Sequence, residues 1–219
     1  MIPTHIEEII LDSLLPRVFA REELPYSEVW RRKVSFRRGG RYLVESASGG
    51  GKSSLAAFIM GARRDYEGSL LFDGREASSL SIADWQAIRR GHIAYLPQEL
   101  SLFPELSAID NIRLKGEICG KVDMMRVEEW MERMGITARR DYPAGRLSIG
   151  QQQRVALIRS LCQPFDFILL DEPVSHLDEA NNRLAAHIVE EEAERQGAAI
   201  ITFSVGNPLL IENTEKLNL

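Results

Sequence analysis

A glycine cluster between a short apolar run and a helical pattern is the feature that most limits how this chain can fold. The segment RYLVE at 41–45 is typical of a short buried strand, and it leads directly into SASGGGKSS at 46–54. From Lys52 onward the apolar residues have helical spacing, and Gly61 is a suitable end for that helix. A strand, a glycine loop and a helix in this order predict a phosphate-binding loop in an α/β fold.

The glycine loop carries the residue types that bind the phosphates of a nucleoside triphosphate. A phosphate loop has a glycine, four further residues, and then glycine, lysine and serine or threonine. Gly51-Lys52-Ser53 completes this pattern, whereas Ser46 stands at the first glycine position. The lysine would contact the β- and γ-phosphates, and the serine hydroxyl would hold Mg²⁺. The predicted nucleotide contacts are Ser48, Gly49, Gly50, Gly51, Lys52, Ser53 and Ser54.

Two carboxylates follow a second apolar run. FILL at 167–170 is typical of a central parallel strand, and Asp171 and Glu172 come directly after it. The carboxyl ends of parallel strands are where ligands bind in open α/β sheets. We therefore expect Asp171 to act on Mg²⁺, directly or through coordinated waters, and Glu172 to act as a general base that polarises the attacking water.

The rest of the chain predicts the architecture around these residues. Strand and helix patterns alternate, which favours an α/β fold with a mostly parallel sheet. Short β-like runs near the N-terminus and a hairpin turn at Asp73-Gly74 predict an additional antiparallel β subdomain. Helical periods dominate residues 99–146, which we interpret as an inserted helical lobe. We expect residues 1–219 to form a single domain.

Composition limits the classes of partner. The net charge is −5, so the chain has no general electrostatic attraction to nucleic acid. No apolar run approaches the ~18 residues of a membrane-spanning helix, and the N-terminus does not resemble a secretory signal. Cys119 and Cys162 fit no metal-binding spacing, and we expect them to be reduced thiols. These features predict a cytoplasmic protein whose contact with a membrane is made through a partner.

Further motifs follow the phosphate loop in a specific order. They are YLPQ at 95–98, LSIGQQQR at 147–154, LDEP at 170–173 and SHLD at 175–178. Together with the phosphate loop they resemble the nucleotide-binding subunit of ATP-binding cassette (ABC) transporters over about residues 29–204. The resemblance implies a P-loop NTPase core that binds ATP and Mg²⁺ and hydrolyses ATP.

The resemblance also implies roles for residues outside the phosphate loop. Gln98 would contact Mg²⁺ and sense the γ-phosphate. LSIGQQQR, called the signature segment below, would place Ser148, Gly150 and Gln151 against the nucleotide held by the opposite subunit of a head-to-tail dimer. Asp178 would organise the interface of this dimer, and His176 would have no role.

The resemblance further implies partners and a location. Two nucleotide-binding subunits would form a homodimer or a heterodimer, and this dimer would drive a separate transmembrane permease. The chain would therefore lie at the cytoplasmic face of the inner (plasma) membrane. The apolar stretch at 100–104 would either dock that partner or pack between the lobes, and the sequence does not distinguish these two roles.

Besides Ser46, two further positions in the motifs depart from the family. Ile149 replaces the first glycine of the signature segment. Phe203, in the segment ITFS, stands where the resemblance implies a histidine that contacts the γ-phosphate. Because phenylalanine cannot donate a hydrogen bond, we expect hydrolysis to be slow.

Three questions stay open at the level of sequence. The adenine ring would stack on an aromatic residue upstream of the phosphate loop, and both Phe19 and Tyr26 are candidates, with Phe19 preferred. A soluble ABC protein that assembles a cytosolic complex is an alternative to a transporter subunit. A nucleotide-gated subunit that hydrolyses poorly is a second alternative, which Ile149 and Phe203 favour.

Overall fold

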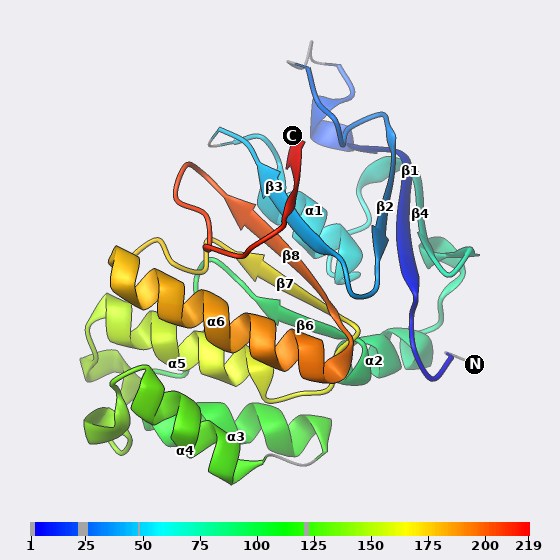
Figure 1. Cartoon of the computed structure of the whole chain (residues 1–219). Coiled ribbons are helices and arrows are strands. Elements are labelled where there is room, and N and C mark those ends of the chain that lie inside the picture. The colour runs from blue at the N-terminus through cyan, green and yellow to red at the C-terminus, as the bar shows by residue number, and fades with distance from the viewer. Residues whose placement is uncertain (1–2, 22–25, 48, 121–122) are drawn as a thin grey trace.

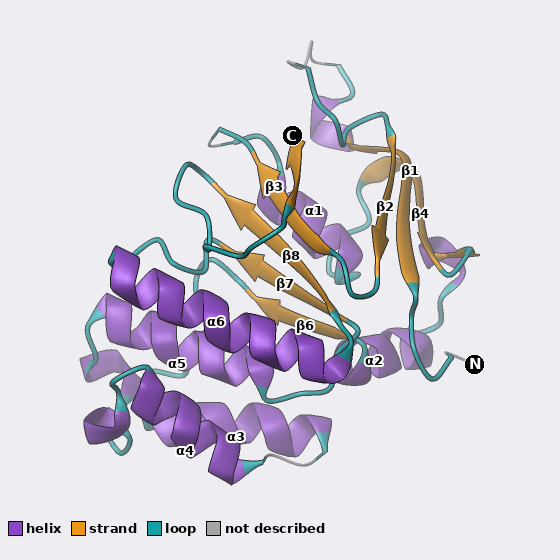
Figure 2. Cartoon of the chain, viewed as in Figure 1, coloured by secondary structure: helices purple, strands orange, loops and turns teal. Residues whose placement is uncertain are grey.

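The chain folds into two β-sheets with helices between and beside them (Figure 1). The computed structural model describes residues 3–21, 26–47, 49–120 and 123–219. An antiparallel sheet has the strand order β2-β1-β4-β5, and a parallel sheet has the order β6-β7-β8-β3-β9. Figure 2 shows the two sheets as separate groups of strands. This arrangement confirms the α/β fold class with an additional antiparallel sheet.

The strands have the following bounds: β1 Glu8–Pro16, β2 Lys33–Arg37, β3 Arg41–Glu45, β4 Tyr66–Phe72, β5 Arg75–Glu76, β6 Ile93–Leu96, β7 Phe167–Asp171, β8 Ala199–Ser204 and β9 Glu215–Asn218. The turn between β4 and β5 contains Asp73 and Gly74, both with positive φ. Two consecutive positive φ angles are typical of a tight hairpin turn, so the expected hairpin is confirmed.

The helices have the following bounds: α1 Lys52–Ile59, α2 Ile82–Gly91, α3 Ala108–Cys119, α4 Met124–Arg133, α5 Ile149–Leu161 and α6 Glu179–Gln196. The helices α3 and α4 form the lobe within 99–146, and α4 buries Val127, Trp130 and Met131 as its periodicity predicts. The helix α6 ends where Gly197 adopts a left-handed conformation.

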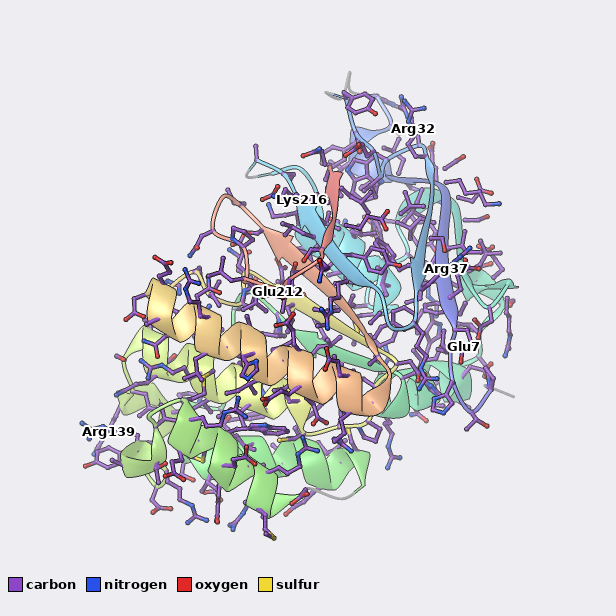
Figure 3. The ribbon with its side chains drawn as sticks, in the orientation of Figure 1. Glu7, Arg32, Arg37, Arg139, Glu212 and Lys216 are labelled. Carbon is purple, nitrogen blue, oxygen red and sulfur yellow. The ribbon has the colours of Figure 1, made fainter. Side chains whose placement is uncertain are left out.

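The parallel sheet has a hydrophobic cluster on each face because successive side chains point to opposite sides of a strand. On β7, Ile168 and Leu170 pack with α5 and α6, whereas Phe167 and Leu169 pack with α1 and the antiparallel sheet. Figure 1 shows α5 and α6 side by side on the first of these faces and α1 between the two sheets. Charged side chains such as Arg37 and Lys216 lie on the outer surface (Figure 3).

Asp166, directly before β7, joins distant parts of the chain. Its side chain is buried, and one carboxylate oxygen lies 2.8 Å from His5 Nδ1 while the other lies 2.6 Å from His92 Nδ1. The Ile6 N–H donates to the carboxylate at 2.8 Å, and Arg38 Nε lies 3.2 Å away. The N-terminal segment, the β2–β3 turn and the start of β6 therefore meet at one buried carboxylate.

Candidate functional site

The phosphate loop joins β3 to α1 beneath two aromatic rings. Gly51 has a φ of 96°, which an L-residue with a side chain rarely adopts. A Cβ built on Gly51 would lie 2.9 Å from Trp30 Cζ2 and 3.0 Å from Phe19 Cε2. The Trp30 indole N–H also donates to the Gly50 carbonyl at 3.0 Å. Trp30 therefore holds the loop in place, a role that the sequence motifs did not indicate.

Lys52 lies inside the turn of this loop. Its ammonium group donates to the carbonyl oxygens of Ser46 and Ala47 at 3.3 and 3.4 Å, and the residue is buried. The predicted contact Ser48 lies outside the described residues. Ser54 accepts a hydrogen bond from the Arg63 guanidinium at 2.9 Å. The loop therefore has a buried cation at its centre, as phosphate binding requires.

The two carboxylates lie next to the start of α1. The Ser53 hydroxyl donates to Asp171 Oδ2 at 2.7 Å. Among the described residues, Asp171 Oδ1 and Glu172 Oε1 are buried with no hydrogen-bond partner. Burial raises the pKa of Asp171, although Ser53 and Lys52 oppose this effect. Burial also raises the pKa of Glu172, which Lys52 lowers and Asp171 raises further.

These groups fit a divalent cation with a preference for oxygen ligands. A serine hydroxyl, an unpartnered aspartate oxygen and the side-chain oxygen of Gln98 are the ligand types that Mg²⁺ takes. A bound cation would also add to the positive charge that Lys52 provides near the buried Asp171 and the half-buried Glu172. The donor set therefore fits the expected metal ion.

A cavity of about 390 Å³ brings most of the predicted residues together. Its lining includes the phosphate loop, the exposed Gln98 and Glu172, which come from three separate segments of the chain. The residues that line it are Val18, Phe19, Gly49, Gly51, Lys52, Ser53, Ser54, Gln98, Glu172 and Val205. Tyr26 is not among them, and it is 74% exposed. Of the two candidates for adenine stacking, the structure therefore places only Phe19 at the cavity.

The signature segment does not line this cavity of its own chain. Ser148 is the N-cap of α5, and its hydroxyl accepts a hydrogen bond from Gln151 N–H at 3.3 Å. The Gln151 side chain returns to the Ser148 N–H at 3.0 Å and completes a capping box. Ile149, in the first helical turn, is 50% exposed. Ser148, Gly150 and Gln151 are thus grouped at a helix N-terminus away from the phosphate loop.

The prediction that Phe203 takes the place of a histidine beside the γ-phosphate is wrong. Phe203 is 0% exposed, and it packs with Ile201 in the cluster between the parallel sheet and α1. It faces this cluster because it lies within β8, where alternate residues share a face. The side chain that reaches the cavity is Val205, just after β8, which is 46% exposed. The Val205 side chain has no polar group. The cavity wall therefore has no hydrogen-bond donor from this side chain, where the resemblance implied one from a histidine.

Three kinds of similarity relate this chain to known proteins: to a family, to individual relatives and to solved structures. The family model described as ABC transporter matches residues 31–175. The macrolide export ATP-binding/permease protein MacB of Shewanella sp. (strain ANA-3) is 32% identical over 171 residues, which are 77% of this chain and 26% of that protein. MacB of Rhodopseudomonas palustris (strain BisB18) is 35% identical over 168 residues, with coverages of 75% and 26%. The chain spans about a quarter of the length of these curated relatives.

Solved structures show the same fold. The dimeric structure of a bacterial ABC transporter cassette has a TM-score of 0.76 and 24% sequence identity, covering 90% of this chain and 87% of that chain. A putative ABC transporter (ATP-binding protein) from Pyrococcus furiosus has a TM-score of 0.73 and 21% identity, with coverages of 96% and 97%. Within the described residues, no helix is both long and apolar enough to cross a membrane.

The fold and the site together define a nucleoside-triphosphate-binding protein of the P-loop class, with the buried lysine inside the glycine loop and two carboxylates at the end of a parallel strand. The match over 31–175 covers more than half of the chain. The chain belongs to the ABC transporter family.

Proposed function

We propose that this chain is the ATP-binding and ATP-hydrolysing subunit of a transporter, that it dimerises around two ATP molecules, and that it drives a separate transmembrane permease. The observation that carries the proposal is the division of the motif residues into two surfaces. The phosphate loop, Gln98 and Glu172 line one cavity, and the signature segment forms a helix N-terminus elsewhere on the chain. A second subunit would bring its signature segment to this cavity.

Nucleotide binding follows from the cavity wall. Backbone N–H groups of the phosphate loop and of the start of α1 would bind phosphate oxygens. They are those of Ser48, Gly49, Gly50, Gly51, Ser53 and Ser54. Lys52 would exchange its contacts to Ser46 and Ala47 for phosphate oxygens. Phe19, at the cavity wall, would stack on the adenine ring.

Magnesium would be held by Ser53, Asp171 and Gln98. When bound, it would neutralise charge on the β- and γ-phosphates. Asp171 would stay ionised beside the metal although burial raises its pKa, because the added positive charge favours the carboxylate form.

Glu172 would act as the general base. Among the described residues its Oε1 has no hydrogen-bond partner, so this oxygen is available to accept a proton from water. Because burial raises the pKa of Glu172 above its usual value of 4.5, its carboxylate is a stronger base than an exposed glutamate. Gln98, which also lines the cavity, would orient the reacting groups.

The dimer would be head to tail, as a homodimer or with a related subunit. Helix α5 spans Ile149–Leu161 and presents the backbone N–H groups of its first turn, with exposed Ser148 as its cap. A helix N-terminus with a hydroxyl cap favours an anion such as a γ-phosphate. Gln151 would support Ser148 in this position through the capping box.

The membrane partner and the direction of transport rest on the relatives. Both MacB proteins are named as export ATP-binding/permease proteins, so we propose export and location at the cytoplasmic face of the inner membrane. Phe103, which follows the Gln98 segment, is 50% exposed and offers an apolar contact to the permease. Co-purification of a multi-span membrane protein with the tagged chain tests this part.

A weakly hydrolysing, nucleotide-gated subunit is the second candidate. The apolar Val205 at the cavity wall and the exposed Ile149 in the signature segment favour it, because neither side chain can donate a hydrogen bond to a phosphate.

The dimer is tested with Glu172→Gln, which keeps the shape of the side chain but cannot accept a proton from water. In saturating ATP and Mg²⁺ this variant should elute from a sizing column as a dimer, because bound ATP is not consumed. Lys52→Ala should bind ATP weakly and stay monomeric. Glu67→Gln, a change at an exposed glutamate on β4, is the matched control and should behave as wild type. A monomeric Glu172→Gln variant under these conditions would contradict the proposal.

A further inference from the structure

We propose that Gln153 is a positioning residue that holds Glu172 in place for hydrolysis and attaches it to the signature helix. This inference rests on the proposed role of Glu172 as general base. Gln153 lies on α5 one helical turn after Ser148 and Gly150, and it is only 1% exposed. Within the residues that the structure describes, Gln153 is the side chain on a helix that hydrogen-bonds to the main chain of Glu172.

The Gln153 carboxamide forms hydrogen bonds to the loop that follows β7 through both its nitrogen and its oxygen. Its Nε2 donates to the Glu172 carbonyl at 2.9 Å and to Ser175 Oγ at 3.2 Å. Its Oε1 accepts a hydrogen bond from the His176 N–H at 3.0 Å. One buried side chain therefore pairs with three polar groups of this loop. The Glu172 carbonyl also accepts from the Ser175 N–H at 3.4 Å and the Ser175 hydroxyl at 3.3 Å, so removing Gln153 would take away the shortest of its hydrogen bonds and the partner of the His176 N–H.

Glu172 is a residue whose backbone requires such support. Its φ is 51°, a left-handed value that costs free energy for a residue other than glycine. On one side its N–H donates to the Phe203 carbonyl at 3.0 Å, and on the other side its carbonyl accepts from Gln153. The carboxylate Oε1 has no partner among the described residues. The position of the carboxylate therefore depends on its backbone, to which Gln153 makes the shortest hydrogen bond at the carbonyl.

A second contact joins the same helix to the same loop. A Cβ built on Gly150 would lie 3.1 Å from the His176 carbonyl oxygen, so the first turn of α5 packs directly on the loop. Gly150 and Gln153 lie on one face of α5, three residues apart. Because both residues contact the loop, Glu172 and the signature helix form one packed unit.

The test combines steady-state hydrolysis with a double-mutant cycle. Gln153→Met keeps the length of the side chain and removes its hydrogen bonds, while Gln153→Asn keeps the amide but shortens its reach by one methylene. Each should lower kcat for ATP by about tenfold or more, because small misplacement of a reacting group has large effects on rate. The KM for ATP and the binding of ATP should stay unchanged, since neither change touches the phosphate loop.

The cycle distinguishes positioning from a general loss of structure. In the Glu172→Gln background, the residual hydrolysis does not use the Glu172 carboxylate, so adding Gln153→Met should change it by less than about twofold. Gln86→Met is the matched control, because it makes the same change at an exposed glutamine on α2, outside the signature segment. It should leave kcat within about twofold of wild type.

Three results would overturn the proposal. The first is an equal loss of activity from Gln153→Met in the wild-type and Glu172→Gln backgrounds. The second is unchanged kcat in a folded Gln153→Asn variant, with folding checked by thermal denaturation. If Glu172→Gln hydrolyses ATP at the wild-type rate, the proposed role of Glu172 fails, and this inference fails with it. That third result is distinct from the first two because it does not require any change at Gln153.

Discussion

Among single side chains, Val205 has a large bearing on the chemistry proposed for the site. It lines the cavity that contains Glu172, and a hydrogen bond from its backbone opposes the effect of burial, which raises the pKa of Glu172. Its isopropyl group offers no donor toward a phosphate. Hydrogen-bond donors aimed at charge that develops in the transition state contribute strongly to catalysis. The absence of such a donor at Val205 therefore predicts a specific deficit in turnover.

Val205→His should raise kcat for ATP hydrolysis by about tenfold, because an imidazole at the cavity wall can donate to the γ-phosphate as charge develops. The affinity for ATP should change little, since the contact strengthens mainly in the transition state. Turnover assays and ATP titrations of both proteins measure the two quantities. Unchanged turnover in a folded Val205→His variant would show that another group already supplies this contact.

Phe203→His provides the contrast. Phe203 is fully buried in the cluster with Ile201, so the imidazole would lose packing and leave polar atoms in an apolar environment. We expect a loss of stability of about 3 kcal/mol or more, which corresponds to a fall in Tm of roughly 6–12 °C. A stable Phe203→His variant with increased turnover would contradict the assignment of Phe203 to the core.

The helices illustrate how far local sequence patterns reach. The start of α1 at Lys52 and its end just before Gly61 follow from the glycine residues and the apolar spacing, and both were predicted. The helix α2 was not predicted, although Ser81 and Asp84 form a capping box and Trp85 and Ile88 lie on its buried face. Its signal was present in the sequence and was missed.

Other features depend on tertiary structure that the sequence does not display. The strand β9 (EKLN) has exposed side chains except for the partly buried Leu217, and it is a strand because it pairs with β3. Which residue reaches the cavity wall depends on where β8 ends and its side chains stop alternating between the two faces. The prediction chose Phe203, whereas Val205 lines the cavity. The nucleotide-binding motifs were easier to predict because each is continuous in sequence, whereas the contacts of Trp30 and Gln153 join segments that are distant in sequence.

The contribution of the α6 N-cap to stability can be tested at Asp178. The resemblance assigned it to the dimer interface, and in the structure it caps α6 by accepting hydrogen bonds from the N–H and side-chain amide of Asn181. Asp178→Ala should lower Tm by about 2–4 °C, whereas Asp178→Asn should retain the cap. Thermal denaturation without nucleotide measures this local effect. If Asp178→Ala has the wild-type Tm, the capping hydrogen bonds do not stabilise α6 in solution.

Across the whole chain, Asp166 connects segments that are far apart in sequence. Burial alone would raise the pKa of Asp166, but hydrogen bonds from His92, the Ile6 N–H and His5 outweigh it and lower the pKa below 3.8. The pKa is therefore lower in the folded state than in the unfolded state. The resulting stabilisation is present above pH 3.8 and is lost as the pH falls through the folded-state pKa.

Asp166→Asn should reduce the free energy of unfolding by about 2 kcal/mol at pH 7, because hydrogen bonds to a charged group are lost. The difference between the variant and wild type should shrink as the pH falls below 3.8. Urea denaturation of both proteins at pH 7, 5 and 3 measures this difference. A difference that is the same at all three pH values would show that the Asp166 charge does not contribute to stability.

The order of strands in the parallel sheet has a consequence for how the protein is made. The strand β3 carries the phosphate loop, yet both of its neighbours, β8 and β9, come from the C-terminal part of the chain. During synthesis β3 leaves the ribosome long before β8 and β9, with both edges unpaired and open to aggregation. Pairing over such sequence distances is also slow. We therefore expect ATP to give little help to the folding of the N-terminal half, because β3, which leads into the phosphate loop, has a paired neighbour only after residues 199–204 have been added.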